Sequence, residues 1–219
     1  MPHDDGQPES RPFPLPPDVD AESGYRLPLP RREDMDIEGQ AVFDATLASA
    51  NASYRGKAGP GAGLKGPAGI QLYSPHYRRV FQAMNDYLRF QAGIPPRLRE
   101  IVILATAGET SHEFEWTAHE PMALREGVEA EIIEIIRSGK PTDTLAAEDS
   151  VAIDLVRETV GRRKVTAGTY AKALSLHGPR TLVDISGLIG HYLAVGVLLN
   201  IFDMQLRPGT QPLLNRSSG

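Results

Sequence analysis

Residues 100–128 read EIVILATAGETSHEFEWTAHEPMALREGV and place four titratable side chains in and around two apolar helical segments. An α-helix advances about 100° per residue, so His112, Glu115 and His119, at i, i+3 and i+7, share one stripe roughly 60° wide. Glu100 heads the apolar run before this stripe, where a carboxylate is costly to bury without a partner. We therefore expect these four side chains to meet.

The stripe contains the groups needed for proton transfer. His112 lies close to the predicted helix start, where the helix dipole favours a neutral imidazole that can accept a proton. Glu115 lies at i,i+4 to His119 and can orient its ring by accepting an N–H. The same residue types also occur in buried networks that only hold helices together, so a structural role is one alternative. Two imidazoles and two carboxylates also suit a divalent ion, although the order H-x-x-E-x-x-x-H differs from the zinc motif H-E-x-x-H.

The composition narrows the class of protein. The 219 residues include no cysteine, so the chain has neither a disulfide nor a thiol nucleophile. Its net charge of −5 argues against nucleic acid and anionic membranes as partners. We recognise no signal peptide and no apolar run of about 18 residues that would span a membrane. We therefore expect a cytoplasmic protein.

The hydrophobic periodicity predicts an all-α protein of about six to eight helices. Eight prolines in residues 1–32 predict an extended proline-rich arm over 1–36, followed by a compact helical domain over 37–208 and a flexible tail over 209–219. Helices are expected at 35–51, 75–90, 96–108, 112–126, 129–138, 147–160, 167–176 and 179–203. Ser74 is expected to cap the second of these, and Thr110 with Glu113 matches a capping box. Gly127 suits the following C-terminal cap.

A glycine-rich stretch separates the first two helices. Residues 55–69 contain six glycines and two prolines without the spacing of a phosphate-binding loop, so we do not expect nucleotide binding. Long loops of this kind are either functional or disordered. Residues 56–69 are therefore either a lid over the site or a flexible linker.

Four further residues are candidates for lining a substrate pocket. Trp116 lies close to the stripe, although a lone tryptophan is often part of the core. His191 and Tyr192 occur in the apolar stretch GLIGHYLAVGVLLNIF, where they either line the same pocket or are hydrogen-bonded core residues. Tyr73 follows the glycine-rich stretch and is a weaker candidate.

Residues 100–128 also resemble the signature of the carboxymuconolactone decarboxylase/alkylhydroperoxidase D-like superfamily. The peroxidase branch of that superfamily carries a glutamate followed by C-x-x-C-x-x-x-H. The four positions fall here on Glu100, His112, Glu115 and His119, so both cysteines are replaced. The segment from Gly66–Pro67 to Tyr73–Ser74–Pro75 and the last apolar helix resemble the decarboxylase-like branch, and the resemblance extends over residues 27–208.

The resemblance implies cofactor-free acid–base chemistry on a small carbonyl, lactone or aromatic-derived acid. The enzyme would be a carbon–carbon lyase or an isomerase, not a thiol peroxidase, with His112 or His119 as base and then acid, Glu115 as orienter and Glu100 as a second relay. The resemblance also implies a homo-oligomer, a trimer or hexamer, in which the arm wraps a neighbour. The alternatives are a metal-dependent enzyme on the same cluster and a non-catalytic ligand-binding or scaffold oligomer.

Overall fold

The structure, a computed structural model, describes residues 14–54 and 62–214, and within these the chain forms eight α-helices and no strand. The all-α prediction is therefore confirmed. The helices are α1 (Ile37–Tyr54), α2 (Pro67–Gln71), α3 (Pro75–Asp86), α4 (Pro96–Glu109), α5 (Glu113–Arg125), α6 (Ala130–Ser138), α7 (Ala147–Val156) and α8 (Ala167–Ile201). Two π-helical turns, Tyr87–Gln91 and Arg157–Gly161, follow α3 and α7, and two short 3₁₀ turns, Arg32–Asp34 and Ala62–Leu64, flank α1.

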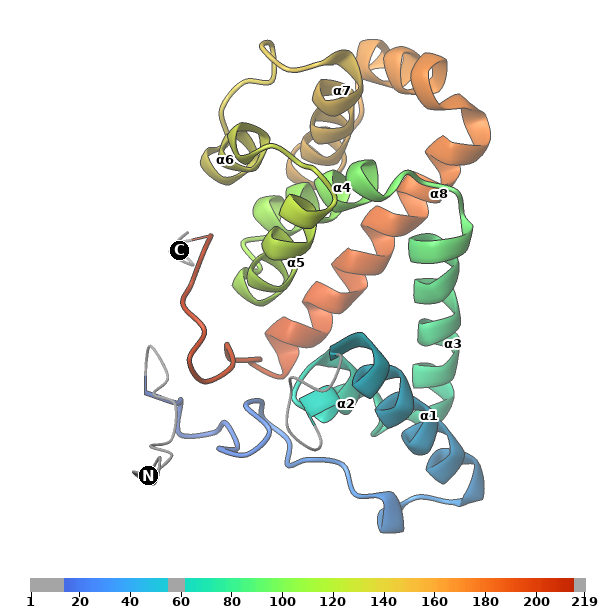
Figure 1. Cartoon of the computed structure of the whole chain (residues 1–219), viewed down its shortest axis with the longest axis vertical. Coiled ribbons are helices and arrows are strands. Elements are labelled where there is room, and N and C mark those ends of the chain that lie inside the picture. Colours follow the sequence, from blue (N-terminus) through green and yellow to red (C-terminus); the bar gives the residue numbers. More distant parts are fainter. Residues whose placement is uncertain (1–13, 55–61, 215–219) are drawn as a thin grey trace, which may run out of the picture.

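Helix α4 forms the centre of the core. It packs against α5, α6, α7 and α8, which surround it in Figure 1. The run Ile101 to Leu104 is fully buried at four successive positions, so every side of the helix faces other elements. A helix that is apolar all round is stable only in such a position. This burial carries Glu100, one residue before the run, into the core as well.

Helix α8 crosses the whole domain and bends once. The two helices expected at 167–176 and 179–203 are two segments of α8, joined at Gly178 (φ 73°) and Pro179. The bend has a clear cause, because proline lacks the N–H of a helical hydrogen bond and glycine tolerates positive φ. By length and mean hydropathy (1.8), α8 could cross a membrane, but 56% of its most apolar window is buried, as in the core helix of a soluble protein.

The start of α5 differs from the predicted capping box. Thr110 follows the end of α4, and its hydroxyl donates to the Thr106 carbonyl at 2.7 Å instead of capping α5. Ser111 then adopts a left-handed φ of 54°, so α5 begins at Glu113 with His112 in the N-cap position. The reason is that a threonine hydroxyl bonds readily to the carbonyl four residues earlier. Ser74 is the N-cap residue of α3, but its side chain makes no capping hydrogen bond. Gly127 (φ 84°) follows the end of α5 as predicted.

The described part of the arm packs against the chain's own body. The fully buried Tyr25 donates its hydroxyl to the Leu64 carbonyl at 3.2 Å, and Arg26 donates its backbone N–H to the Phe202 carbonyl at 2.8 Å. At the other end, in the segment expected to be a flexible tail, Leu214 is buried and donates its N–H to Glu113 Oε1 at 2.9 Å. Residues 1–13, 55–61 and 215–219, which include much of the glycine-rich stretch, lie outside the described residues.

The contact between the arm and α2 yields a prediction. A Cβ at Gly69 would lie 1.9 Å from the Leu64 carbonyl oxygen and 2.8 Å from the Tyr25 hydroxyl. Overpacking of this kind costs about 1–3 kcal/mol, so Gly69→Ala should lower the free energy of unfolding by at least that much in urea denaturation. The matched control is Gly168→Ala in α8, where no atom lies within 4 Å and stability should stay at or above the wild-type value. Equal stability of the two variants would contradict the packing described for the arm.

Candidate active site

Three helices bring four polar side chains together in the core. Helix α4 supplies Glu100, α5 supplies Glu115 and His119 one turn apart, and α8 supplies Tyr192. Their exposed fractions are 0% for Glu100, 7% for Glu115, 4% for His119 and 5% for Tyr192. Because α4 packs on both α5 and α8, Glu100 meets His119 of the predicted stripe directly, and Glu115 joins the cluster through the other nitrogen of the His119 ring.

The His119 ring has different partners on its two nitrogens. Nδ1 lies 2.7 Å from Glu100 Oε2, whereas Nε2 lies 3.2 Å from the Tyr192 hydroxyl and 3.5 Å from Glu115 Oε2. An ionised carboxylate only accepts hydrogen bonds, so Nδ1 carries the proton, and in the neutral ring Nε2 carries the lone pair. The hydroxyl of Tyr192 can donate to this nitrogen. The arrangement therefore orients a base and leaves its reactive nitrogen on the side of Tyr192 and Glu115.

Glu100 is held in its ionised form. Arg99 donates from Nε to Glu100 Oε1 at 3.0 Å, so both carboxylate oxygens have a partner. Burial opposes ionisation of Glu100, but its contacts with His119 and the neighbouring arginines outweigh burial, and the pKa of this carboxyl lies below its usual value. Arg99 was not among the predicted site residues, although a basic residue directly before a glutamate that must be buried was an available signal.

Glu115 and Tyr192 favour their protonated forms. Burial raises the pKa of the Glu115 carboxyl, against the opposing charges of His119 and Arg89. Burial also raises the pKa of the Tyr192 hydroxyl well above its usual value. The cluster thus separates two carboxyl groups across one imidazole, one ionised and one inclined to hold a proton. Environments that push the pKa values of two carboxyl groups apart are typical of acid–base sites.

His112 does not join this cluster. As the N-cap residue it has non-helical dihedral angles (φ −84°, ψ 89°), so the helical spacing that predicted its position does not apply to it. Its Nδ1 lies 2.8 Å from the Thr110 hydroxyl, and its ring lies across Gly196 of α8, where a Cβ would collide with it. Burial lowers the pKa of His112. Among the described residues, no hydrogen bond or ion pair links His112 to Glu115 or His119.

Of the four predicted lining residues, Tyr192 contacts His119 directly. His191 precedes Tyr192 in α8. The His191 ring packs on the Phe81 ring with centroids 4.3 Å apart, and it meets the Tyr192 ring edge-on with centroids 5.5 Å apart. Burial lowers the pKa of His191 to about 4, so this ring is neutral at physiological pH. Its Nδ1 is buried and has no hydrogen-bond partner in the described part of the chain.

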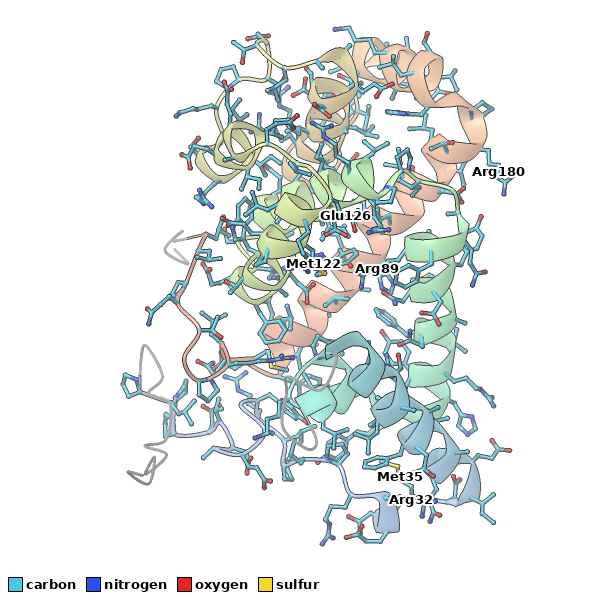
Figure 2. The ribbon with its side chains drawn as sticks, in the orientation of Figure 1. Arg32, Met35, Arg89, Met122, Glu126 and Arg180 are labelled. Carbon is cyan, nitrogen blue, oxygen red and sulfur yellow. The ribbon has the colours of Figure 1, made fainter. Side chains whose placement is uncertain are left out.

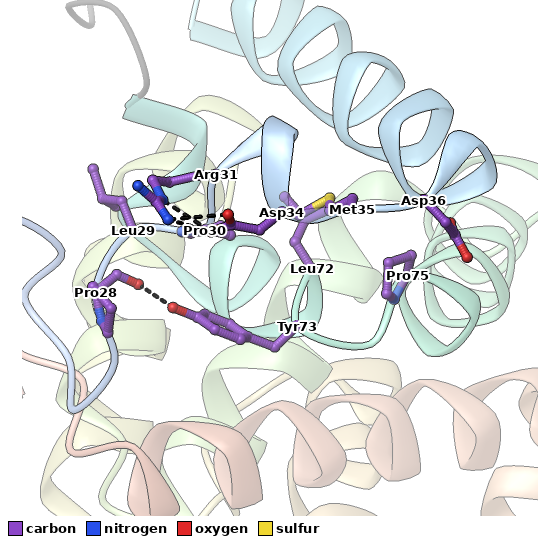
Figure 3. A pocket seen from close by; sticks show the side chains of 10 residues that line it. All are labelled: Pro28, Leu29, Pro30, Arg31, Asp34, Met35, Asp36, Leu72, Tyr73 and Pro75. Atoms are coloured by element: carbon purple, nitrogen blue, oxygen red, sulfur yellow. Dashed lines mark hydrogen bonds and ion pairs between the residues drawn. The ribbon is translucent and has the colours of Figure 1, made fainter.

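Trp116 and Tyr73 lie elsewhere. Trp116 is fully buried in the core, where its indole N–H donates to Glu120 and the Arg137 guanidinium lies 5.4 Å from its ring centroid. Tyr73 lines a cavity between the arm and the turn from α2 to α3, and its hydroxyl donates to the Pro28 carbonyl at 2.8 Å (Figure 3). The stripe spacing could not place either side chain, because Trp116 faces another side of α5 and Tyr73 belongs to a different part of the fold.

The cluster does not have the geometry of a metal centre. Glu100 and Glu115 lie at opposite edges of the His119 ring, so the three side chains cannot converge on one ion as they stand. No group of three or more His, Asp or Glu side chains within residues 14–54 and 62–214 is arranged to hold a metal.

Comparisons with known proteins agree with this architecture. Residues 75–158, which include Glu100, Glu115 and His119, match the family model of the carboxymuconolactone decarboxylase family. A crystal structure described as an alkylhydroperoxidase AhpD core, an uncharacterized peroxidase-related protein from Ralstonia eutropha JMP134, superposes with a TM-score of 0.64 at 14% identity, covering 87% of this chain and 98% of that one. At 14% identity this similarity shows only that the two proteins share a fold. No curated protein matches the chain significantly. Over residues 75–158 the chain is therefore similar to the carboxymuconolactone decarboxylase family, and its fold is similar to that of the AhpD-like protein.

Proposed function

We propose that the chain is a cofactor-independent lyase or isomerase that transfers a proton at a carbon next to a carbonyl group. Its substrate would be a small carbonyl compound, lactone or aromatic-derived acid, and its location cytoplasmic. The observation that carries the proposal is the buried Glu100–His119 pair, in which the second ring nitrogen of His119 faces Tyr192 and Glu115. The family match supports a decarboxylase-like enzyme. Peroxide reduction by thiols does not suit a sequence without cysteine.

The roles follow from the two sides of the imidazole. Glu100 fixes the tautomer of His119 and supports the positive charge that forms on its ring. The sequence had suggested Glu115, instead of Glu100, as the residue that orients this ring. Nε2 of His119 removes the proton from the substrate carbon and leaves an enolate. Protonated Glu115 returns a proton to the enolate at a second atom. The proton on Nε2 then passes to the Glu115 carboxylate, whose Oε2 is 3.5 Å away, and both groups regain their starting forms.

Exchange of substrate protons with solvent measures this proton transfer directly. A panel of small keto acids and lactones in D₂O should show enzyme-dependent loss of the NMR signal from the hydrogen next to the carbonyl. His119→Asn keeps an N–H donor for Glu100 but has no basic nitrogen, so exchange per folded molecule should fall about 10²–10⁴-fold. His76→Ala, at an exposed histidine on α3, is the matched control and should exchange at the wild-type rate.

Two outcomes would contradict the proposal. Wild-type exchange in His119→Asn would assign the cluster to structure, particularly if that variant were strongly destabilised. Loss of wild-type exchange on chelation, with recovery on adding zinc or manganese, would assign the cluster to a metal-dependent reaction.

The raised pKa of the buried Glu115 carboxyl predicts a specific pH dependence of stability. A carboxyl group with a raised pKa in the folded state contributes stability below its ordinary pKa and loses it as the pH rises through the folded value. Glu115→Gln removes this dependence. Its stability relative to wild type should therefore increase as the pH rises above the ordinary carboxyl value of about 4, by about 1.4 kcal/mol per unit of pKa elevation. Urea unfolding at a series of pH values measures the difference. Glu131→Gln, on the exposed side of α6, should show no such trend, and a flat difference for Glu115→Gln would show that its carboxyl is already ionised.

We also propose that the protein is a homo-oligomer. Five large apolar side chains recur every three or four residues along α3 and the following π-turn and remain partly exposed, namely Tyr77, Val80, Met84, Tyr87 and Phe90. The exposed fraction reaches 68% at Val80 and 67% at Phe90. A continuous exposed apolar stripe of this kind is typical of a protein–protein interface.

A matched pair of substitutions tests this interface. Met84 on the stripe and Leu176 on the first segment of α8 are both 41% exposed. Met84→Lys should lower the molar mass measured by light scattering at micromolar concentration, because a charge at an apolar interface must be desolvated. Leu176→Lys should leave the assembly unchanged. A monomeric wild type would contradict the proposal.

A further inference from the structure

Arg89 carries a positive charge that lacks an ionic partner. Three other buried or half-buried arginines pair with carboxylates: Arg97 with Asp149, Arg99 with Glu100 and Arg137 with Glu120. The buried Arg78 has no carboxylate but donates to Thr46 and Gln71. No carboxylate of the described residues forms an ion pair with Arg89. Its Nε is buried without a hydrogen-bond partner, and its Nη2 meets only the weak acceptor Met122 Sδ, at 3.9 Å. A buried donor left in this state is destabilising, which calls for an explanation.

The contact with Met122 places the guanidinium beside the acid–base cluster. Met122 follows His119 by three residues and Glu115 by seven, so it continues the same face of α5. Figure 2 shows Arg89 and Met122 near each other between α5 and the segment after α3, with α8 behind them. The charge of Arg89 also reaches the cluster, since it contributes to the pKa values of Glu100, Glu115, His191 and Tyr192.

The backbone around Arg89 is held firmly. Arg89 lies in the π-helical turn Tyr87–Gln91, a rare conformation that is frequent at functional sites. The Tyr87 hydroxyl donates to Asp184 Oδ1 at 3.0 Å, and Leu88 packs closely against Gly187, so this turn is fixed on α8. Arg99, the arginine that pairs with Glu100, also donates to the Arg89 carbonyl at 2.7 Å. The network that fixes the His119 base therefore also fixes the position of Arg89.

We propose that Arg89 binds a carboxylate group of the substrate and so sets the substrate class as a small organic acid. The two Nη groups of a guanidinium form a planar fork that matches the two oxygens of a carboxylate. Arg89 is half-buried, and its Nη1, unlike its Nε, is not enclosed, so a ligand can reach the end of the guanidinium from solvent. With the carboxylate held at Arg89, the carbon next to the carbonyl group is presented to His119. This last step rests on the proposed acid–base function, whereas the binding of the carboxylate does not.

Calorimetric titration with matched acids and amides tests the proposal. Benzoate and acetate are the probes, and benzamide and acetamide are their neutral counterparts. The wild type should prefer each acid over its amide. Arg89→Met should weaken benzoate binding about 10- to 100-fold, the loss expected for a charge-assisted hydrogen bond. The affinity of Arg89→Lys for benzoate should lie between those of the wild type and Arg89→Met. Arg180→Met is the matched control at an exposed arginine far from the cluster (Figure 2) and should bind benzoate as the wild type does.

Thermal unfolding of the same variants separates binding from a structural role. The ring of Phe90 lies 5.3 Å from the Arg89 guanidinium, and this cation–π contact is the structural alternative. If binding is the role of Arg89, Arg89→Met should melt no lower than the wild type, because it removes an unpartnered donor. A lower melting temperature together with unchanged benzoate binding would overturn the proposal, as would a wild type that prefers neither acid.

His119→Asn separates this inference from the proposed function. This variant should still bind benzoate, because the base is not needed for binding. Benzoate binding that depends on Arg89, in a wild type without proton exchange, would refute the acid–base function and leave the carboxylate site intact. Proton exchange that depends on His119 but is indifferent to Arg89→Met would refute the carboxylate site alone.

Discussion

The fold depends on keeping one ionised carboxylate in its core. Glu100 is fully buried on the central helix α4, and an unpaired charge in that position would destabilise the domain severely. Arg99 from the same helix and His119 from α5 each bind one of its oxygens. This requirement fixes how α5 lies on α4, because the imidazole has to face the carboxylate. The orientation of α5 then decides which residues can approach the other nitrogen of the ring, so packing and chemistry share one set of contacts.

Sequence patterns predicted the parts of the site that lie inside regular helices. Glu115 and His119 are one turn apart on α5, and helical geometry alone puts them side by side. The uninterrupted apolar run after Glu100 predicted a helix buried on every side and hence a carboxylate in need of partners. Gly178 and Pro179 likewise predicted the break in α8, because their backbone preferences are local. In each case the deciding physics acts over only a few residues.

The sequence-based predictions fail where tertiary contacts or a turn determine the position of a side chain. His112 satisfies the spacing of the stripe, yet the left-handed Ser111 makes it an N-cap residue and turns it towards Gly196. Trp116 is equally close in sequence but belongs to the core around Arg137. Arg89 carries no sequence signal, because its position depends on a π-helical turn fixed by α8. The composition of the arm predicted its irregular backbone but not the burial of Tyr25.

The distribution of imperfect contacts bears on whether the cluster is structural or functional. A network selected only for stability would satisfy both nitrogens of the His119 ring, because buried polar groups without good partners are costly. Here Nδ1 has a short bond to an ionised carboxylate at 2.7 Å, whereas Nε2 has only the longer hydrogen bond to the Tyr192 hydroxyl at 3.2 Å and lies 3.5 Å from Glu115 Oε2. Two buried nitrogens without hydrogen-bond partners, Arg89 Nε and His191 Nδ1, belong to residues next to this cluster, whereas others, such as His177 Nε2, lie elsewhere in the described chain. Unsatisfied buried groups beside a polar cluster are typical of sites where stability is given up for function. The asymmetry of the His119 environment therefore favours a base that is held firmly on one side and more weakly on the other.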